Sequence, residues 1–314
     1  SGSRMTQMMS SWMSGVTEND LEAFKAWLED PETGISQYTS GISYEYDTSM
    51  IIYRTDLETP MQVNPSTAME ATGMDDMMSM MSGSSGIQET MMSSTMHMMN
   101  VFVQLLDNEQ LLDSQYTVLA GRMPEAMDEA VILLNSRNEL SDYFLYTVGL
   151  RDQSELKGQF QKLMKGEPIE SEEMEFSYEE LMAMRFRLPV NTDLYQKHGT
   201  VWADESADPE FLAEVLSNAL EIKIVGVLRP SAGAVVGETS SIGYRSELMA
   251  YLLDKINNSE IVREQLADPG RDVFTDHPFS SVEQDALDLL DTMDVDDFLS
   301  LLENQGLIPA GMIP

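Results

Sequence analysis

The chain has 314 residues, of which 42% are hydrophobic, and its 54 acidic and 18 basic side chains give a formal net charge of −36. This length and apolar content can bury a substantial core, whereas the negative field repels the phosphate backbone of nucleic acids. No cysteine is present, which excludes disulfides and thiolate metal sites. No apolar run approaches the ~20 residues of a membrane-spanning helix.

The first part of the chain predicts a helix and a β-hairpin. The opening SGSRM lacks the charged and apolar regions of a signal peptide. We interpret residues 1–5 as a vector remnant and the start of the expressed segment. Residues 17–29 predict an amphipathic helix, since Thr17-x-x-Asp20 has the spacing of a capping box. Alternation over 42–46 and the β-rich run 50–54 predict two strands, paired as a hairpin.

Residues 69–100 form a loop rich in methionine, serine and glycine, with eleven methionines from Met69 to Met99. Methionine is a flexible filler of promiscuous apolar surfaces, so this loop is a candidate partner surface. Met96-His97-Met98-Met99 leaves a second interpretation open, because thioethers and imidazole suit Cu(I). The candidate surface comprises Met77, Met78, Met80, Met81, Met91, Met92, Met96, Met98 and Met99.

The next segment predicts a compact strand–turn–strand–helix block. Apolar spacing predicts a helix over 101–112, and 116–119 reads as a short strand. The continuously apolar run 130–134 predicts a buried strand. Asn138 is then predicted to cap a helix that Gly149 ends.

Residues 151–220 are more polar than their flanks and predict a mainly helical inserted subdomain, with helices opening near Ser154, Ser177 and Asp208. The run EIKIVGVL at 221–228 predicts a return to the core as a strand.

Residues 221–275 form the second part of the core in this interpretation, with helices over 246–257 and 259–266. The last segment, 276–314, is predicted to be acidic and helical, because residues 282–303 place leucines opposite aspartates.

The sequence predicts no catalytic residue, no metal site and no cofactor. Its three histidines, His97, His198 and His277, are far apart in the sequence and lack a thiol partner. No H-E-x-x-H cluster and no G-x-x-x-x-G-K-[ST] loop occurs, so neither a zinc site nor an ATP-binding P-loop is expected.

The block LAGRMPEAMDEAVILLNSRNELSDYFLYTVGL, Leu119–Leu150, resembles the extracellular domain of MacB/FtsX-type ABC transporter permeases of Gram-positive bacteria. The runs QVNPST at 62–67, EIKIVGVLRP at 221–230 and SIGYRSEL at 241–248 extend the resemblance over most of residues 17–275. The family-motif residues expected to have a structural role are Gly121, Arg122, Pro124, Glu129, Asn138, Ser141, Asp142, Tyr146 and Gly149.

The resemblance implies an α+β fold, in which a mixed sheet with packed helices forms a porter-like βαβ portion beside an inserted subdomain. Residues 6–150 would hold the first part of this core. It also implies an extracellular domain at the plasma membrane, whose partners are the transmembrane helices of the permease and its ATPase. Contact with the membrane would come only through helices that flank the chain. The family exports or extracts peptides, antibiotics and lipids, and the charge of −36 suits a cationic peptide.

Two further points stay open at this stage. Arg122 could lock its turn by a bidentate pair with Glu125, Asp128 or Glu129, or it could be an ordinary solvated arginine. A different class of function is a freestanding secreted protein that binds a cationic peptide or Cu(I) through its methionines.

Overall fold

The structure is a computed structural model, and it describes residues 20–44, 46, 48–68, 100–165, 174–234 and 239–279. The chain divides into two compact units. One unit comprises Ser1–Ile42 with Glu283–Pro314, and the other comprises Ser43–Val282.

The described part of the smaller unit is the helix α2 (Leu21–Glu29) followed by two 3₁₀ turns, η1 (Pro31–Thr33) and η2 (Ile35–Gln37). Asp20 is the N-cap of α2, since its carboxylate accepts a hydrogen bond from the backbone N–H of Ala23 at 2.9 Å. Asp20 was predicted as the last residue of a capping box that begins at Thr17, which lies outside the described residues.

The larger unit is built on a mixed sheet whose strands follow the order β2-β1-β6-β9-β5-β10-β3. Strand β4 lies outside this order and pairs with the C-terminal half of β9. Strand β5 runs parallel to β9, and β10 runs parallel to β3, whereas the other neighbours are antiparallel. The chain therefore has the predicted α+β fold with a mixed sheet. The strands are β1 (Ile52–Arg54), β2 (Met61–Asn64), β3 (Phe102–Gln104), β4 (Tyr116–Gly121), β5 (Glu129–Leu133), β6 (Arg185–Leu188), β9 (Leu220–Pro230) and β10 (Ser241–Tyr244).

Both faces of the sheet are covered, as the alternation of β5 makes clear. Ala130 and Ile132 of β5 join the main hydrophobic core, whereas Val131 and Leu133 join a smaller cluster on the opposite face. The main core includes side chains of α6 (Asp142–Thr147), α8 (Tyr178–Ala183) and α10 (Ser246–Asn257). The helix α5 (Glu109–Gln115) contributes Leu112 to the smaller cluster. This explains why β5 is continuously apolar from Ala130 to Leu133, with no polar residue facing either side.

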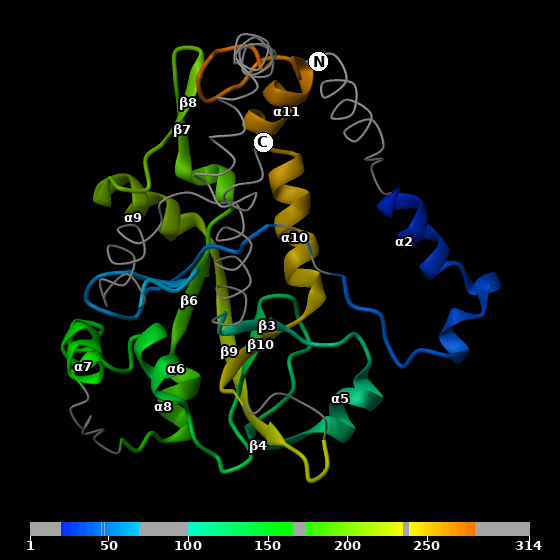
Figure 1. Ribbon diagram of the computed structural model, residues 1–314, viewed down its shortest axis with the longest axis vertical. Helices are drawn as coiled ribbons and strands as arrows, with labels where there is room; N and C mark the ends of the chain where they lie inside the picture. Colours follow the sequence, from blue (N-terminus) through cyan, green and yellow to red (C-terminus); the bar gives the residue numbers. More distant parts are fainter. Residues whose placement is uncertain are drawn as a thin grey trace, which may run out of the picture. The chain divides into compact units, whose positions relative to one another are not determined.

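The other elements of the larger unit are the helices α7 (Ser154–Met164), α9 (Pro209–Asn218) and α11 (Glu260–Ala267), the turn η4 (Asn191–Leu194) and the hairpin β7 (Tyr195–His198) with β8 (Val201–Asp204). Figure 1 shows this hairpin beside α11, and β4 at the opposite end of the sheet. Several predicted elements are confirmed: the strands at 116–119, 130–134 and 221–228, and the helices at 154–165, 246–257 and 259–266.

Two predictions for the first part of the sheet are wrong. The predicted hairpin of 42–46 with 50–54 does not form, because β1 pairs with β2 and β6 instead. The helix predicted over 101–112 begins only at Glu109, where the Asn108 side chain caps it, and β3 precedes it. Phe102 and Leu105 are buried against the sheet, so tertiary packing overrides their helical spacing.

The predicted cap of α6 is also wrong. The hydroxyl of Ser141, not the side chain of Asn138, accepts the capping hydrogen bond, from Phe144 N at 3.2 Å. Asn138 lies in the preceding turn with a φ of 63°, a conformation that asparagine tolerates better than most residues. Gly149 ends the helix as predicted, with a φ of 69°.

Residues 151–220, predicted as a mainly helical inserted subdomain, have the three predicted helices and three strands that the sequence did not predict. They contain α7, α8 and α9, but also the hairpin β7–β8 and the strand β6, which lies between β1 and β9 in the main sheet. The short run Arg185–Leu188 buries alternate residues, Phe186 and Leu188, a pattern of four residues that is too brief to distinguish from a helix by periodicity. Residues 282–303 lie outside the described part of the chain.

Candidate functional site

The family-motif residues at the start of the matched block meet in one turn between β4 and β5. Arg122 Nη1 donates to Glu129 Oε2 at 2.7 Å, and its Nη2 donates to Oε1 at 2.5 Å, which makes a bidentate pair. The same carboxylate accepts backbone hydrogen bonds from Glu125 N at 2.8 Å and Ala126 N at 3.2 Å. Of the three acidic neighbours, Glu129 is the one that Arg122 binds through two hydrogen bonds, and Glu125 Oε1 lies 4.0 Å from Nη1. The predicted bidentate pair forms, and the Arg122 side chain is still 46% exposed to solvent.

This arrangement lowers the pKa of Glu129 from its ordinary value of 4.5 to about 2. The hydrogen bond from Arg122 is the largest cause, and the two backbone N–H groups add to it, against an opposing effect of partial burial. The Glu129 side chain is 13% exposed, whereas that of Arg122 is 46% exposed. The carboxylate is thus held ionised at physiological pH, as a clamp on the turn rather than as a proton donor.

Gly121 allows the backbone at this turn to approach β9 closely. Its φ is 69°, and a Cβ atom built on it would lie 2.1 Å from the carbonyl oxygen of Val225. Gly226 faces it, and a Cβ there would lie 2.2 Å from the carbonyl oxygen of Arg122. Only glycine fits at Gly121, because both the conformation and the space exclude a side chain.

The second group of family-motif residues holds α6 in place. Asp142 pairs with Arg151 at 3.4 Å, and the buried Tyr146 accepts a hydrogen bond on its hydroxyl from Gln159 Nε2 at 2.6 Å. A Cβ on Gly149 would lie 2.5 Å from Cε of Met61.

Pro124 lies in the turn between β4 and β5, and its carbonyl oxygen accepts a hydrogen bond from Arg245 Nη1 at 3.3 Å. These contacts position helix and sheet, and none of the family-motif residues lines the cavity described next.

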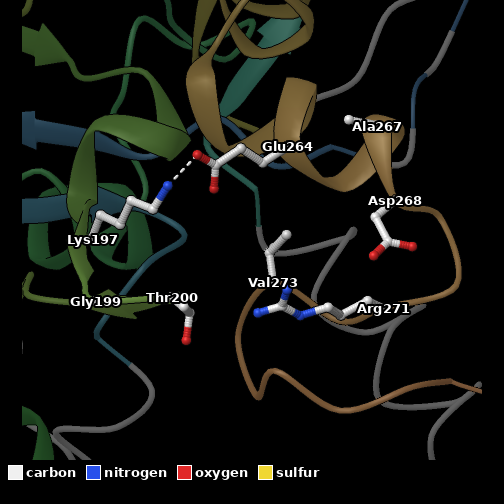
Figure 2. A pocket seen from close by; sticks show the side chains of 8 residues that line it. All are labelled: Lys197, Gly199, Thr200, Glu264, Ala267, Asp268, Arg271 and Val273. Atoms are coloured by element: carbon white, nitrogen blue, oxygen red, sulfur yellow. Dashed lines mark hydrogen bonds and ion pairs between the residues drawn. The ribbon is translucent and has the colours of Figure 1, made fainter.

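An open cavity of about 300 Å³ lies at the end of the larger unit that carries the hairpin β7–β8. Its walls are the turn of that hairpin, the last turn of α11 and the loop that follows, as Figure 2 shows. The lining residues are Lys197, Gly199, Thr200, Glu264, Ala267, Asp268, Arg271 and Val273.

One side of the cavity is formed by an ion pair, Lys197 with Glu264, that packs beside the indole of Trp202. Lys197 Nζ forms an ion pair with Glu264 Oε1, while Trp202 Nε1 donates to the other oxygen, Oε2, at 2.9 Å. The ammonium also lies 5.8 Å from the centre of the Trp202 ring. The hydrogen bond from Lys197, followed by that from Trp202, lowers the pKa of Glu264 below its ordinary value.

The other side of the cavity is a loop fixed by its own hydrogen bonds. Arg271 forms an ion pair with Asp276, whose second oxygen accepts a hydrogen bond from the Thr200 hydroxyl at 2.8 Å. Trp202 N donates to the carbonyl of Val273 at 3.0 Å, which ties the loop to β8. The walls are therefore already in place before any ligand arrives.

Nothing in the sequence singled out this cavity. The one signal nearby was histidine, but His198 pairs with Glu205 at 2.8 Å, and neither His198 nor His277 lines the cavity. Ligands that come from a hairpin, a helix and a loop have no fixed spacing in a sequence, so no motif could reveal them.

The described residues contain neither a cluster of metal ligands nor a membrane-spanning helix. No group of three or more histidine, cysteine or acidic side chains there could hold a metal ion. Within the same part of the chain, no helix is both long and apolar enough to cross a membrane.

The methionines of the candidate partner surface, together with His97, lie outside the described residues. Both interpretations of the methionine-rich loop, as a partner surface or as a Cu(I) site, therefore stay predictions. Comparisons with models of protein families, with curated proteins and with solved structures found no match for this chain.

Proposed function

We propose that this chain is the extracellular, non-catalytic domain of an ABC transporter permease of the MacB/FtsX type. The observation that carries the proposal is the role of the matched block. Residues 119–150 supply the second half of β4 and all of β5 and α6, and β5 pairs in parallel with β9 after a connection that includes helices. Strand β6 of the same sheet also lies in that connection, so what supports the proposal is the coarser agreement with a mixed sheet and packed helices.

The proposed role is mechanical coupling rather than chemistry. The bidentate pair of Arg122 with Glu129 and the close approach of Gly121 to β9 hold the block as one rigid piece. In the intact permease, ATP hydrolysed in the cytosol would move this piece through the transmembrane helices to which it is joined. The transported substrate would be a peptide, an antibiotic or a lipid, exported or extracted at the outer face of the plasma membrane.

The charge of −36 favours a cationic peptide among these substrates. A negative field of this size raises the local concentration of cations and increases their rate of association, and it repels anionic ligands. Nucleic acid is not expected as a partner for the same reason.

A labelling experiment in intact cells tests the location. The chain has no cysteine, so a Val118→Cys substitution places one reporter thiol in it, on a β4 residue that is 42% exposed. Any cysteine elsewhere in the full-length protein is first replaced by serine. A maleimide that cannot cross membranes should label it in intact cells, with the protein in the membrane fraction. A cysteine placed in the cytosolic ATPase, the matched control, should react only after lysis.

The coding sequence on either side of residues 6–314 gives an independent test. Hydrophobic runs of about 20 residues on the flanks, with a P-loop ATPase encoded nearby, would agree with the proposal. A signal peptide directly before the domain and a stop codon directly after it would refute it. The alternative, a secreted protein that binds a cationic peptide or Cu(I), would then be tested by calorimetry with Met91–Met99 methionines changed to leucine.

A further inference from the structure

The cavity beside α11 has an uneven balance of charge. Five charged side chains line it or pair with its lining, two positive and three negative. Lys197 is compensated by Glu264, and Arg271 is compensated by Asp276. Both cations therefore already have a carboxylate partner, which makes the site a poor receptor for an anion.

Asp268 is the one charged lining residue, among those described, that has no partner of opposite charge. Among the described residues, no ion pair or hydrogen bond reaches its carboxylate, although its backbone N–H donates to the carbonyl of Glu264 at 3.2 Å. Figure 2 shows Asp268 across the hollow from Lys197. Asp268 is also the residue that ends α11, and the last carbonyl groups of a helix add a partial negative charge at that point.

Among the other lining residues, the Thr200 hydroxyl already donates a hydrogen bond to Asp276. Ala267 and Val273 line the cavity without offering a polar side chain. A ligand that matches these features has a single positive charge at the end of a short hydrocarbon chain. We infer that the cavity binds a primary alkylammonium group, with the ammonium beside Asp268 and the methylenes along Ala267 and Val273.

Such a group occurs in polyamines and in lysine side chains, and the recognition would be the same for both. The negative field of the chain would draw either of them towards the site. The inference stands on the cavity alone and holds whether or not the chain belongs to a transporter.

The test is an NMR titration of the full chain, labelled with ¹⁵N at tryptophan. The chain has three tryptophans, and the indole signal of Trp202 is assigned with a Trp202→Phe variant. This indole donates to Glu264 at the cavity wall, so it reports on occupancy. Butylammonium should shift the Trp202 signal in a saturable way, whereas butanol, which has the same chain without the charge, should not.

Asp268→Asn is the decisive variant, with Asp113→Asn as its matched control. Asp113 is an exposed residue of α5, remote from the cavity lining, and its substitution removes the same charge from the chain. Asp268→Asn should weaken the binding of butylammonium about fivefold, the effect of one partly exposed ion pair, and Asp113→Asn should leave it nearly unchanged. Among the described residues, neither carboxylate takes part in a hydrogen bond or an ion pair, so both variants should keep the unfolding midpoint of the parent chain.

Three results would overturn the inference: an unmoved Trp202 signal, an equal shift with butanol, or equal losses of affinity in the two variants. The last would mean that cations gather only in the general field of the protein. Titrations with spermidine and with a lysine peptide blocked at both ends then separate the sources. Tighter binding of spermidine would support a polyamine, and tighter binding of the peptide would support a lysine side chain.

Discussion

At the scale of single residues, the turn between β4 and β5 shows how two unlike devices fix one backbone. The first is an ion pair, in which Arg122 donates two hydrogen bonds to the Glu129 carboxylate across the turn. The second is the absence of a side chain at Gly121, which allows the backbone there to pack directly against Val225 of β9. Each device makes a separate prediction for stability.

Glu129→Gln should lower the free energy of unfolding at pH 7 by about 1–2 kcal/mol. This is less than the full displacement of the pKa would imply, because solvent reaches the 46% exposed Arg122 and screens the pair. Glu125→Gln is the matched control, since Glu125 is 77% exposed and its carboxylate lies 4.0 Å from Arg122. Urea denaturation of the two variants and the parent chain measures the difference.

The same variant predicts a dependence on pH. The folded state holds the pKa of Glu129 at about 2, below its ordinary value of 4.5, so its contribution to stability is fully present above about pH 4.5. The contribution is lost as the pH falls towards 2. The difference in the free energy of unfolding between the parent chain and Glu129→Gln should therefore decrease from pH 5 to pH 3. A difference that increased over that range would contradict the proposed role of Glu129 as a clamp.

Gly121→Ala should destabilise the protein by about 2–4 kcal/mol, because it combines a left-handed φ with an overlap of backbone atoms that cannot move aside. Gly199→Ala separates the two causes. Gly199 has nearly the same φ, 68°, but nothing lies within 4 Å of the Cβ position. Its substitution should cost only the conformational part, about 1 kcal/mol, in the same denaturation experiment. Equal losses at the two sites would show that the close approach to β9 contributes nothing.

At the scale of elements, the caps of helices were easier to predict than the positions of short strands. Ser177 and Glu180 form the complete capping box that their spacing predicts, and Asp208 caps α9. Caps depend on neighbours three residues away, so the sequence contains both partners. A strand of three or four residues, such as β3 or β6, depends on partners far along the chain, so its own residues do not identify it.

The start of α6 provides a direct test, because the sequence favoured Asn138 as its cap and the structure assigns Ser141. Ser141→Ala should cost about 1 kcal/mol, since the N–H of Phe144 then loses its acceptor. Asn138→Gly should change stability by less than about 0.5 kcal/mol, because glycine adopts the φ of 63° without strain. Thermal unfolding followed by circular dichroism checks both, and a larger loss at Asn138 would restore the original assignment.

At the scale of the whole molecule, the charge of −36 is the dominant property. Like charges on a folded surface repel one another more than in an expanded chain, which opposes folding. The ion pairs of the larger unit act against this repulsion, but most of them are on the surface, where each contributes little. Net repulsion should therefore govern the response to salt.

We expect the melting temperature to rise by a few degrees between about 10 mM and about 150 mM NaCl, because the screening length falls from about 30 Å to about 8 Å. Scanning calorimetry at the two salt concentrations measures this change. Sucrose at equal osmolality is the control for effects that do not involve charge. A melting temperature that falls on adding salt would mean that the ion pairs outweigh the repulsion.

The sequence by itself determined the properties that depend on composition or on near neighbours. These include the net charge, the apolar strands β5 and β9, most helices and the capping box of Ser177 with Glu180. Apart from the charge, each of them is set within about a dozen residues, the range over which periodicity and capping act.

Only the tertiary structure decided which strands pair, and it alone revealed the cavity. The strand β1 pairs with β6, more than a hundred residues away, and Lys197 meets Glu264, 67 residues away. Contacts of this kind are chosen by the burial of shared apolar surface over the whole unit, and no local pattern specifies that choice. A hollow made by three separate elements, with Asp268 as its one uncompensated charge among the described lining residues, is a consequence of that assembly.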